Sequence, residues 1–205
     1  MKKVKIWLIS LLCIVTLFIA SPALADRIAK KSPDYPVVVE NLNQLLTIKA
    51  DPQQTEYTPE ALTQEISKLE FQKYVLETAE DWGICRNETG KNLAIYARNP
   101  KKGTPTSIFY LGNGQETDDN WDCEGVYIPN DRLVASLELP SGQPSVVQIL
   151  DGTSLTISAN PDTGELSLDV PSALVEVVDP ANTTLTIPNI TQAEVDAQIA
   201  NAPID

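Results

Sequence analysis

The sequence predicts an α+β protein, in which N-terminal helices are followed by a mainly antiparallel β-sandwich or barrel-like domain and a short C-terminal helix. Before residue 80 the apolar residues recur at helical spacing, whereas after Trp82 short runs alternate apolar and polar residues. Turn residues separate these runs about every 8–12 positions, a spacing typical of antiparallel sheets. We therefore expect a signal peptide (1–25), a leader and helical segment (26–80), an antiparallel β domain (81–190) and a short helical tail (191–205).

The first 25 residues have the pattern of a signal peptide. Three lysines precede an apolar run over residues 6–20, and small residues stand at Ala23 and Ala25. Signal peptidase recognises such small residues, which predicts cleavage between Ala25 and Asp26. The apolar run of 15 residues is shorter than the roughly 20 that a membrane-spanning helix needs, and an uncleaved anchor is the alternative. We expect an exported protein, in the periplasm, an equivalent lumen or the extracellular space, with no membrane insertion after cleavage.

Two helices are expected ahead of the β domain. The first begins near residue 34, where apolar residues recur at helical spacing, namely Val38, Val39, Leu42, Leu45 and Leu46. The second begins at Thr58, Pro59 and Glu60, which supply a cap, a proline suited to the first turn and an acid at the positive end of the helix dipole. Its buried stripe would be Leu62, Ile66 and Leu69. Periodicity leaves open whether residues 71–80 continue this helix or begin a strand.

The β domain is expected to contain short strands joined by tight turns. Residues 87–90 predict a hairpin turn, Asp151-Gly152 predicts a second, and residues 160–165 predict a third. Thr191 and Glu194 form a capping-box pattern that opens the terminal helix. The expected strands are 84–86, 93–97, 107–111, 125–128, 133–139, 146–150, 153–159, 166–170, 174–178 and 184–187.

The composition excludes several functions. The chain has 28 acidic and 15 basic residues, a formal net charge of −13. Such a surface repels phosphate backbones, so we expect no binding to nucleic acid. We expect the acidic residues to keep the protein soluble; the alternative is that they attract a basic partner. The chain has no histidine, which removes Ser–His and Cys–His catalytic pairs and histidine-ligated metals. We assign no catalytic residue and no cofactor.

The cysteines predict one disulfide. Cys13 lies in the apolar N-terminal run, which leaves Cys85 and Cys123 as a pair separated by 38 residues. An even number of cysteines in an exported chain indicates a structural bridge. A loop of this size predicts a stabilisation of about 3–4 kcal/mol. A redox-active pair and two free thiols are the alternatives, although the chain has no CxxC motif.

An acidic loop near residue 120 is a weak calcium candidate. Three of its residues have the 1-3-5 spacing of a calcium loop. An EF-hand would then require glycine and an acid at positions where Cys123 and Pro129 stand, so the segment is not an EF-hand. We expect a solvated acidic loop and no metal; a looser calcium site would use Asp118, Asn120, Asp122 and Glu124.

These observations favour an exported, soluble, non-catalytic binding or accessory protein with an unknown protein partner. One alternative is a carbohydrate- or calcium-dependent binding module, for which the aromatic candidates are Trp82, Trp121, Tyr96, Tyr110 and Tyr127. A second alternative is a carboxylate-based hydrolase, because paired acids come together in space and not in sequence. The sequence does not predict an oligomeric state.

Overall fold

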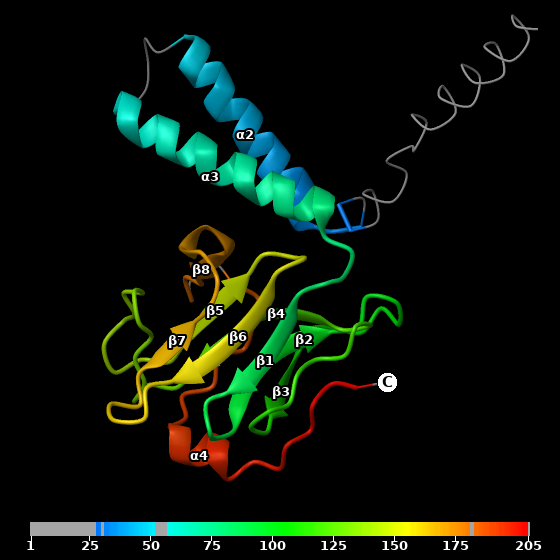
Figure 1. Ribbon diagram of the computed structural model, residues 1–205, viewed down its shortest axis with the longest axis vertical. Coiled ribbons are helices and arrows are strands. Elements are labelled where there is room, and N and C mark those ends of the chain that lie inside the picture. The colour runs from blue at the N-terminus through cyan, green and yellow to red at the C-terminus, as the bar shows by residue number, and fades with distance from the viewer. Residues whose placement is uncertain (1–27, 30, 52–56, 181–182, 205) are drawn as a thin grey trace, which may run out of the picture.

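A pair of helices stands on one end of a two-layered β domain (Figure 1). The computed structural model describes residues 28–29, 31–51, 57–180 and 183–204. The expected signal peptide and its cleavage point between Ala25 and Asp26 therefore lie outside the described residues. The architecture agrees with the predicted α+β class: helices first, two mainly antiparallel sheets next, and a short helix near the C-terminus.

The helical pair consists of α2 (Asp34–Ala50) and α3 (Pro59–Thr78), which pack along their apolar stripes. The Thr58 hydroxyl accepts a hydrogen bond from the Ala61 N–H at 3.1 Å, so the expected cap is present. Residues 71–78 continue the helix, because the fully buried Leu76 extends the same stripe. The stripe of the pair comprises Val38, Leu42, Leu45, Leu62, Ile66, Leu69 and Leu76. No helix in the described ranges is long and apolar enough to cross a membrane.

Two sheets form the β domain. The smaller has the strand order β1-β6-β7, with β1 (Ile84–Glu88), β6 (Ser154–Ala159) and β7 (Leu166–Leu168). The larger has the order β3-β2-β4-β5-β8, with β3 (Ser107–Leu111), β2 (Leu93–Arg98), β4 (Asp122–Ile128), β5 (Ser145–Ile149) and β8 (Val175–Val177). Among the described strands, β1 and β6 pair in parallel and the other pairs are antiparallel.

The central strands of the larger sheet, β2 and β4, are buried on both faces. One face packs on the smaller sheet through a core that includes Ile95, Val126 and Leu155. The other face is covered by the C-terminal segment, which includes α4 (Gln192–Asp196). Two tyrosine hydroxyls hold this segment by donating to carbonyl oxygens: Tyr96 to Thr186 and Tyr127 to Pro188, each at 2.7 Å. The expected capping box of Thr191 and Glu194 opens α4.

Two of the expected hairpins are wrong, because the chain changes sheets at both turns. Residues 87–90 lead from β1 to β2, and Asp151-Gly152 leads from β5 to β6. Each sequence does reverse the chain, but a turn motif does not specify which strand becomes the hydrogen-bonding partner. At the first turn the buried Asn87 amide donates to the carbonyls of Lys91 and Leu111, both at 2.8 Å, and thereby fixes the crossing. The hairpin at 160–165, which joins β6 to β7, is confirmed.

Two expected strands are also wrong. Residues 133–139 form one isolated bridge, Val134 with Leu166, and then turn at Ser136, whose φ is 63°. That left-handed conformation interrupts an extended strand. Residues 184–187 lie across the face of the larger sheet, where Leu185 and Ile187 pack on its apolar surface. Apolar residues alternate in this segment because every second side chain packs against the larger sheet, although the segment is not itself a strand of that sheet.

Candidate functional site

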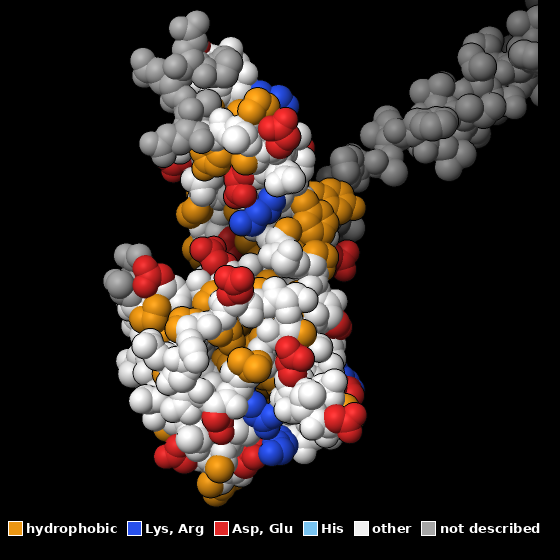
Figure 2. All heavy atoms as spheres, turned by 90° about the vertical axis from the view of Figure 1, so that its left-hand side faces the viewer, with side chains coloured by type: hydrophobic (Ala, Val, Ile, Leu, Met, Phe, Trp, Pro, Cys, Tyr) orange, Lys and Arg blue, Asp and Glu red, His pale blue; other side chains and the backbone are white. Residues whose placement is uncertain are grey.

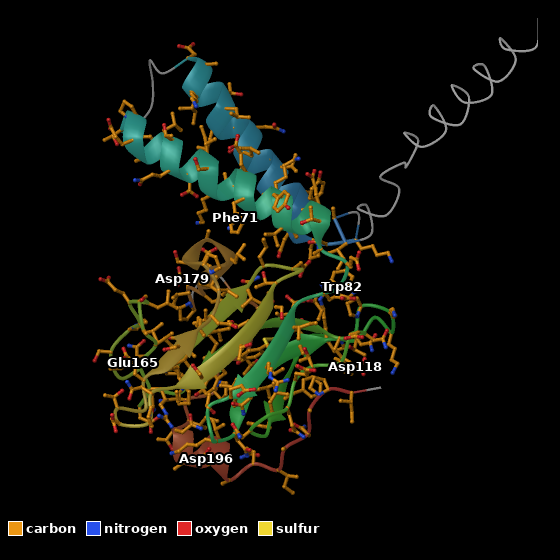
Figure 3. All side chains as sticks on the ribbon, viewed as in Figure 1. Phe71, Trp82, Asp118, Glu165, Asp179 and Asp196 are labelled. Carbon is orange, nitrogen blue, oxygen red and sulfur yellow. A yellow bond between two sulfur atoms is a disulfide. The ribbon has the colours of Figure 1, made fainter. Side chains whose placement is uncertain are left out.

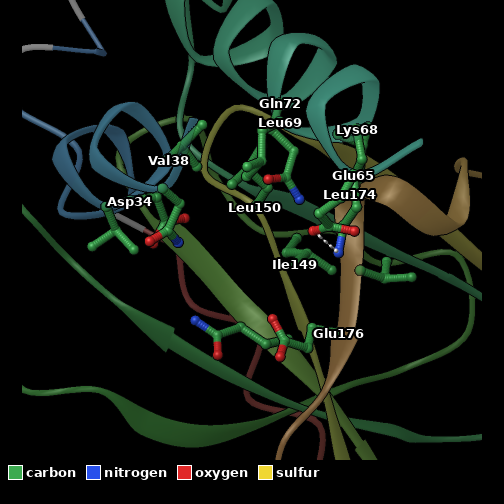
Figure 4. Close-up of a pocket in the computed structure, with 14 residues that line it drawn as sticks. Asp34, Val38, Glu65, Lys68, Leu69, Gln72, Ile149, Leu150, Leu174 and Glu176 are labelled. Carbon is green, nitrogen blue, oxygen red and sulfur yellow. Dashed lines mark ion pairs between the residues drawn. The ribbon is translucent and has the colours of Figure 1, made fainter. Parts of the chain in front are cut away.

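A cleft of about 420 Å³ separates the helical pair from the β domain (Figure 4). One wall comes from α2 and α3, and the other comes from β5, β8 and the turn before β8. Figure 2 shows acidic side chains gathered where the helices meet the β domain. We treat this cleft as the candidate site.

The floor of the cleft is apolar and its rim is polar. The floor is formed by Val38, Leu69, Ile149, Leu150 and Leu174. On the exposed sheet surface, Gln148 of β5 stands directly opposite Glu176 of β8. From α3, the Gln72 amide crosses the cleft and donates to the Ala173 carbonyl at 2.6 Å. This contact ties the helical pair to the edge of the larger sheet.

The charged residues of the cleft are mainly acidic. Asp34, Glu65 and Glu176 line it, against the single cation Lys68 among its lining residues. The Lys68 ammonium is paired with the Glu65 carboxylate at 3.5 Å, so these two charges largely offset each other. The remaining field of the cleft is negative and favours a cationic ligand.

Beneath the cleft lies a group of buried charges, which we call the Arg98 cluster: Arg98, Asp34, Asp122, Glu124 and Asp151. Asp34 belongs to both places, because it lines the cleft and its Oδ2 accepts a hydrogen bond from the Asp151 N–H at 3.1 Å. Asp122 has 0% exposure and Asp151 has 3%. The cluster therefore lies at the junction between α2 and the β domain, where Asp122 and Asp151 are out of contact with bulk water and the side chains of Arg98 and Glu124 are 22% and 20% exposed.

The Arg98 guanidinium organises this cluster. Its Nη2 donates to Asp122 Oδ2 at 2.6 Å, and its Nε pairs with Glu124. The guanidinium also lies over the Trp82 ring, 5.4 Å from the ring centroid, in a cation–π contact. Asp122 is fixed further by the Gly83 N–H, which donates to its Oδ1 at 3.1 Å.

Burial raises the pKa values of the acids in the cluster. The pKa of Asp122 rises to about 8, chiefly through loss of hydration and then through the charges of Asp151 and Glu124. The pKa of Asp151 rises to about 7, through loss of hydration and then the neighbouring Asp34. The pKa of Asp34 is also raised, again mainly by burial. One guanidinium thus faces four carboxyl groups, and bound protons reduce the excess negative charge near neutral pH.

The four calcium candidates separate into two pairs. Asp122 and Glu124 turn toward Arg98. Asp118 and Asn120 lie in the preceding turn, where Asp118 Oδ1 accepts the Asn120 N–H at 3.1 Å and the Asn120 side chain bonds to Lys101; Figure 3 shows Asp118 on the side of the β domain. No group of three acidic or cysteine side chains in the described part of the chain is placed to hold a metal ion.

We predict that millimolar calcium leaves the melting temperature unchanged. The carboxylates of Asp122 and Glu124 already bind Arg98, and a calcium ion would have to displace that cation from a buried position. Differential scanning calorimetry with and without calcium checks this prediction. A rise of several degrees that disappears in Asp118→Asn would instead assign a calcium site to the loop, since ligand binding stabilises the folded state.

The aromatic candidates do not gather on one exposed surface. Tyr96 and Tyr127 are buried beneath the C-terminal segment. Trp121 packs edge-on against Phe109, with ring centroids 5.2 Å apart. Trp82 is covered by the junction of helices and sheet, where Arg98 meets its ring. These aromatic candidates of the carbohydrate-binding alternative therefore form no shared exposed platform.

Sequence reasoning missed Asp34, Arg98 and Asp151 as members of a site. Asp34 stands at the start of a helix and Asp151 in an Asp-Gly turn, so local structure accounts for both residue types. Arg98 ends a strand, a position where charged residues are common. Only the fold brings the three together, since they come from α2, β2 and the β5–β6 turn.

Comparison with known proteins identifies no relative of this chain. No protein-family model matches the sequence, no curated protein matches it, and no solved structure matches it.

Proposed function

We propose that this is an exported, non-catalytic binding protein whose cleft receives a basic segment of a partner protein. The observation that carries the proposal is the cleft of about 420 Å³ between the helical pair and the larger sheet, with an apolar floor and an acidic rim. A lysine or arginine side chain has an aliphatic stem that suits such a floor and a cation that suits such a rim. The net charge of −13 would attract the same partner over longer distances.

A binding role fits the chemistry of the acids better than hydrolysis does. A carboxylate hydrolase needs two acids in contact with its substrate. Here the acids with strongly raised pKa values, Asp122 and Asp151, have 0% and 3% exposure and are not among the residues that line the cleft. The chain also has no histidine to act as an alternative general base. The second alternative, a carboxylate-based hydrolase, thus depends only on the acids at the rim of the cleft.

Two features support export. The first 25 residues have the pattern of a cleavable signal peptide. The disulfide between Cys85 and Cys123 fits an oxidising compartment, because such bridges are rare where thiols are kept reduced.

We predict that a labelled peptide alternating lysine and leucine binds the protein, and that Glu176→Gln weakens this binding several-fold. Glu176 is exposed at the rim, so its loss removes a charge without disturbing the core. One such charge contributes on the order of 1 kcal/mol, or about fivefold in Kd. Fluorescence anisotropy measures the binding, which should also weaken as salt is raised.

The matched control is Glu165→Gln, which makes the same change in net charge at the β6–β7 turn, away from the cleft (Figure 3). This variant should bind the peptide like the unmodified protein. Equal weakening in both variants would show nonspecific attraction to an acidic surface and would overturn the proposed site. Binding of a glutamate–leucine peptide with similar affinity would do the same.

A further inference from the structure

The helical pair is attached to the β domain around the turn that carries Asp151. Leu150 packs into the apolar core of the helical pair. Gly152 approaches the end of α3 so closely that an added Cβ would lie 2.4 Å from the Ala79 Cβ. Between them, the Asp151 N–H donates to Asp34 at the start of α2. The 150–152 turn is therefore a joint between the two parts of the molecule.

The Asp151 carboxyl group sits in this joint without a matching cation. Within the described ranges its Oδ2 is buried and has no hydrogen-bond partner. The Ser32 hydroxyl hydrogen-bonds to the carboxyl group, and the same hydroxyl oxygen accepts the Asp34 N–H at 3.1 Å. The charged groups that face Asp151 are Asp34 from α2, Asp122 and Glu124 from β4, and Arg98 from β2. The Arg98 guanidinium donates its hydrogen bonds to Asp122 and Glu124, and not to Asp151.

We propose that Asp151 is a pH-sensitive latch: the neutral carboxyl group holds the helical pair against the β domain, and the ionised carboxylate loosens it. An ionised Asp151 would be a buried charge beside a second acid, with one oxygen unsolvated and unpaired. Swinging the helical pair outward restores water to that oxygen. Because α2 and α3 form one wall of the cleft, the latch also regulates the cleft, and this regulatory role rests on the proposed function.

The direction of the pH dependence follows from the raised pKa. When the helices are docked, the pKa of Asp151 is about 7, against an ordinary value of 3.8 when it is hydrated. The docked state thus holds the proton more tightly, and docking is strongest below pH 4. Docking of the helical pair weakens as the pH rises from 4 to 7. Above pH 7, Asp151 is ionised in both states and causes no further weakening. Asp34 and Asp122, whose pKa values are also raised, act in the same direction.

The test is amide hydrogen exchange of the full chain at pH 5.5 and pH 8, with each rate corrected for its intrinsic pH dependence. Protection in α2 and in the last turns of α3 should fall at least tenfold at the higher pH, whereas protection in β2 and β4 should stay the same. In Asp151→Asn, a neutral side chain occupies the joint at both pH values, so the fall in helix protection should be much smaller, because only Asp34 and Asp122 still respond to pH. Asp162→Asn, an exposed acid in the β6–β7 turn, should keep the original pH dependence.

Asp34→Asn provides a second measurement should Asp151→Asn fold poorly. Removing the neighbouring charge lowers the pKa of Asp151, so the loss of helix protection should move to lower pH. Unchanged helix protection between pH 5.5 and 8 in the original protein would overturn the latch, as would a full pH response in Asp151→Asn. The exchange measurement uses no ligand. Failure of the lysine–leucine peptide to bind would therefore count against the proposed function and leave the latch standing.

Discussion

Replacing Arg98 with methionine is expected to lower the free energy of unfolding at pH 9 by about 3–5 kcal/mol, because removing one partner of a buried ion pair leaves the other charge uncompensated. Arg98 is the cation of the buried cluster, and its partner Asp122 has 0% side-chain exposure. The change also removes the contact with Trp82. Urea unfolding monitored by circular dichroism measures the loss.

Arg86→Met is the matched control. Arg86 likewise pairs with two carboxylates, Glu88 and Glu116, but its side chain is 43% exposed. Water screens those pairs, so the control should cost much less than Arg98→Met. Adding Asp122→Asn to Arg98→Met should recover part of the stability, since the unpaired acid is then neutral. Similar losses in the two arginine variants would show that the buried cluster contributes no more than a surface ion pair.

The same variant should show a distinct pH dependence. Without Arg98, the folded protein tolerates Asp122 only in its neutral form, which raises the pKa of this acid above its already elevated value of about 8. The stability difference between Arg98→Met and the original protein should therefore shrink as the pH falls from 9 to 7. A purely structural loss of side-chain packing would give a constant difference over this range.

The elements with strong local signals were predictable from the sequence. Thr58 and Pro59 define the start of α3 through capping chemistry that needs no tertiary contact. The α4 capping box is equally local. Residues 71–80 were ambiguous because Tyr74, Val75 and Leu76 suit either a helix or a strand. Residues 71–78 are helical because Leu76 then packs in the apolar core that α2 and α3 share, a tertiary contact that the sequence does not show.

Strand pairing was less predictable, because it depends on how the layers stack. The run that became β2 alternates Ile95 with Tyr96, and both are buried, one toward the smaller sheet and one toward the C-terminal segment. A sheet covered on both faces loses the clean alternation that identifies an exposed face. From the Asp151-Gly152 sequence, the position of a chain reversal was similarly predictable. The passage of the chain from one sheet to the other at this turn was not.

The candidate site was predictable only in fragments. Asp122 and Glu124 were singled out for their spacing, but as ligands for a metal and not as partners of Arg98. Asp34 and Asp151 are 117 residues apart, and nothing local indicates that they meet. The cleft itself arises from the angle at which the helical pair stands on the sheet, a tertiary feature that sequence periodicity does not encode.

Opening the disulfide is expected to destabilise the protein by about 3–4 kcal/mol, because the bond restricts the unfolded chain over a loop of 38 residues. Cys85 in β1 and Cys123 in β4 join the two sheets, and both sulfurs lie in the core between them. Urea unfolding of the original protein with and without dithiothreitol measures the effect. The midpoint should fall markedly on reduction.

The control is the double variant Cys85→Ala, Cys123→Val, which removes the bond while partly refilling the core. It should unfold at the lower midpoint in both buffers, since it has no bridge left to reduce. The flanking backbone bonds, such as the Cys123 N–H to the Gly83 carbonyl at 2.8 Å, keep β1 beside β4 in the folded variant. The cross-link therefore acts mainly on the unfolded chain, and the native near-ultraviolet spectrum should survive its loss. Recovery of alkylated Cys85 and Cys123 from the native oxidised protein would contradict the bridge.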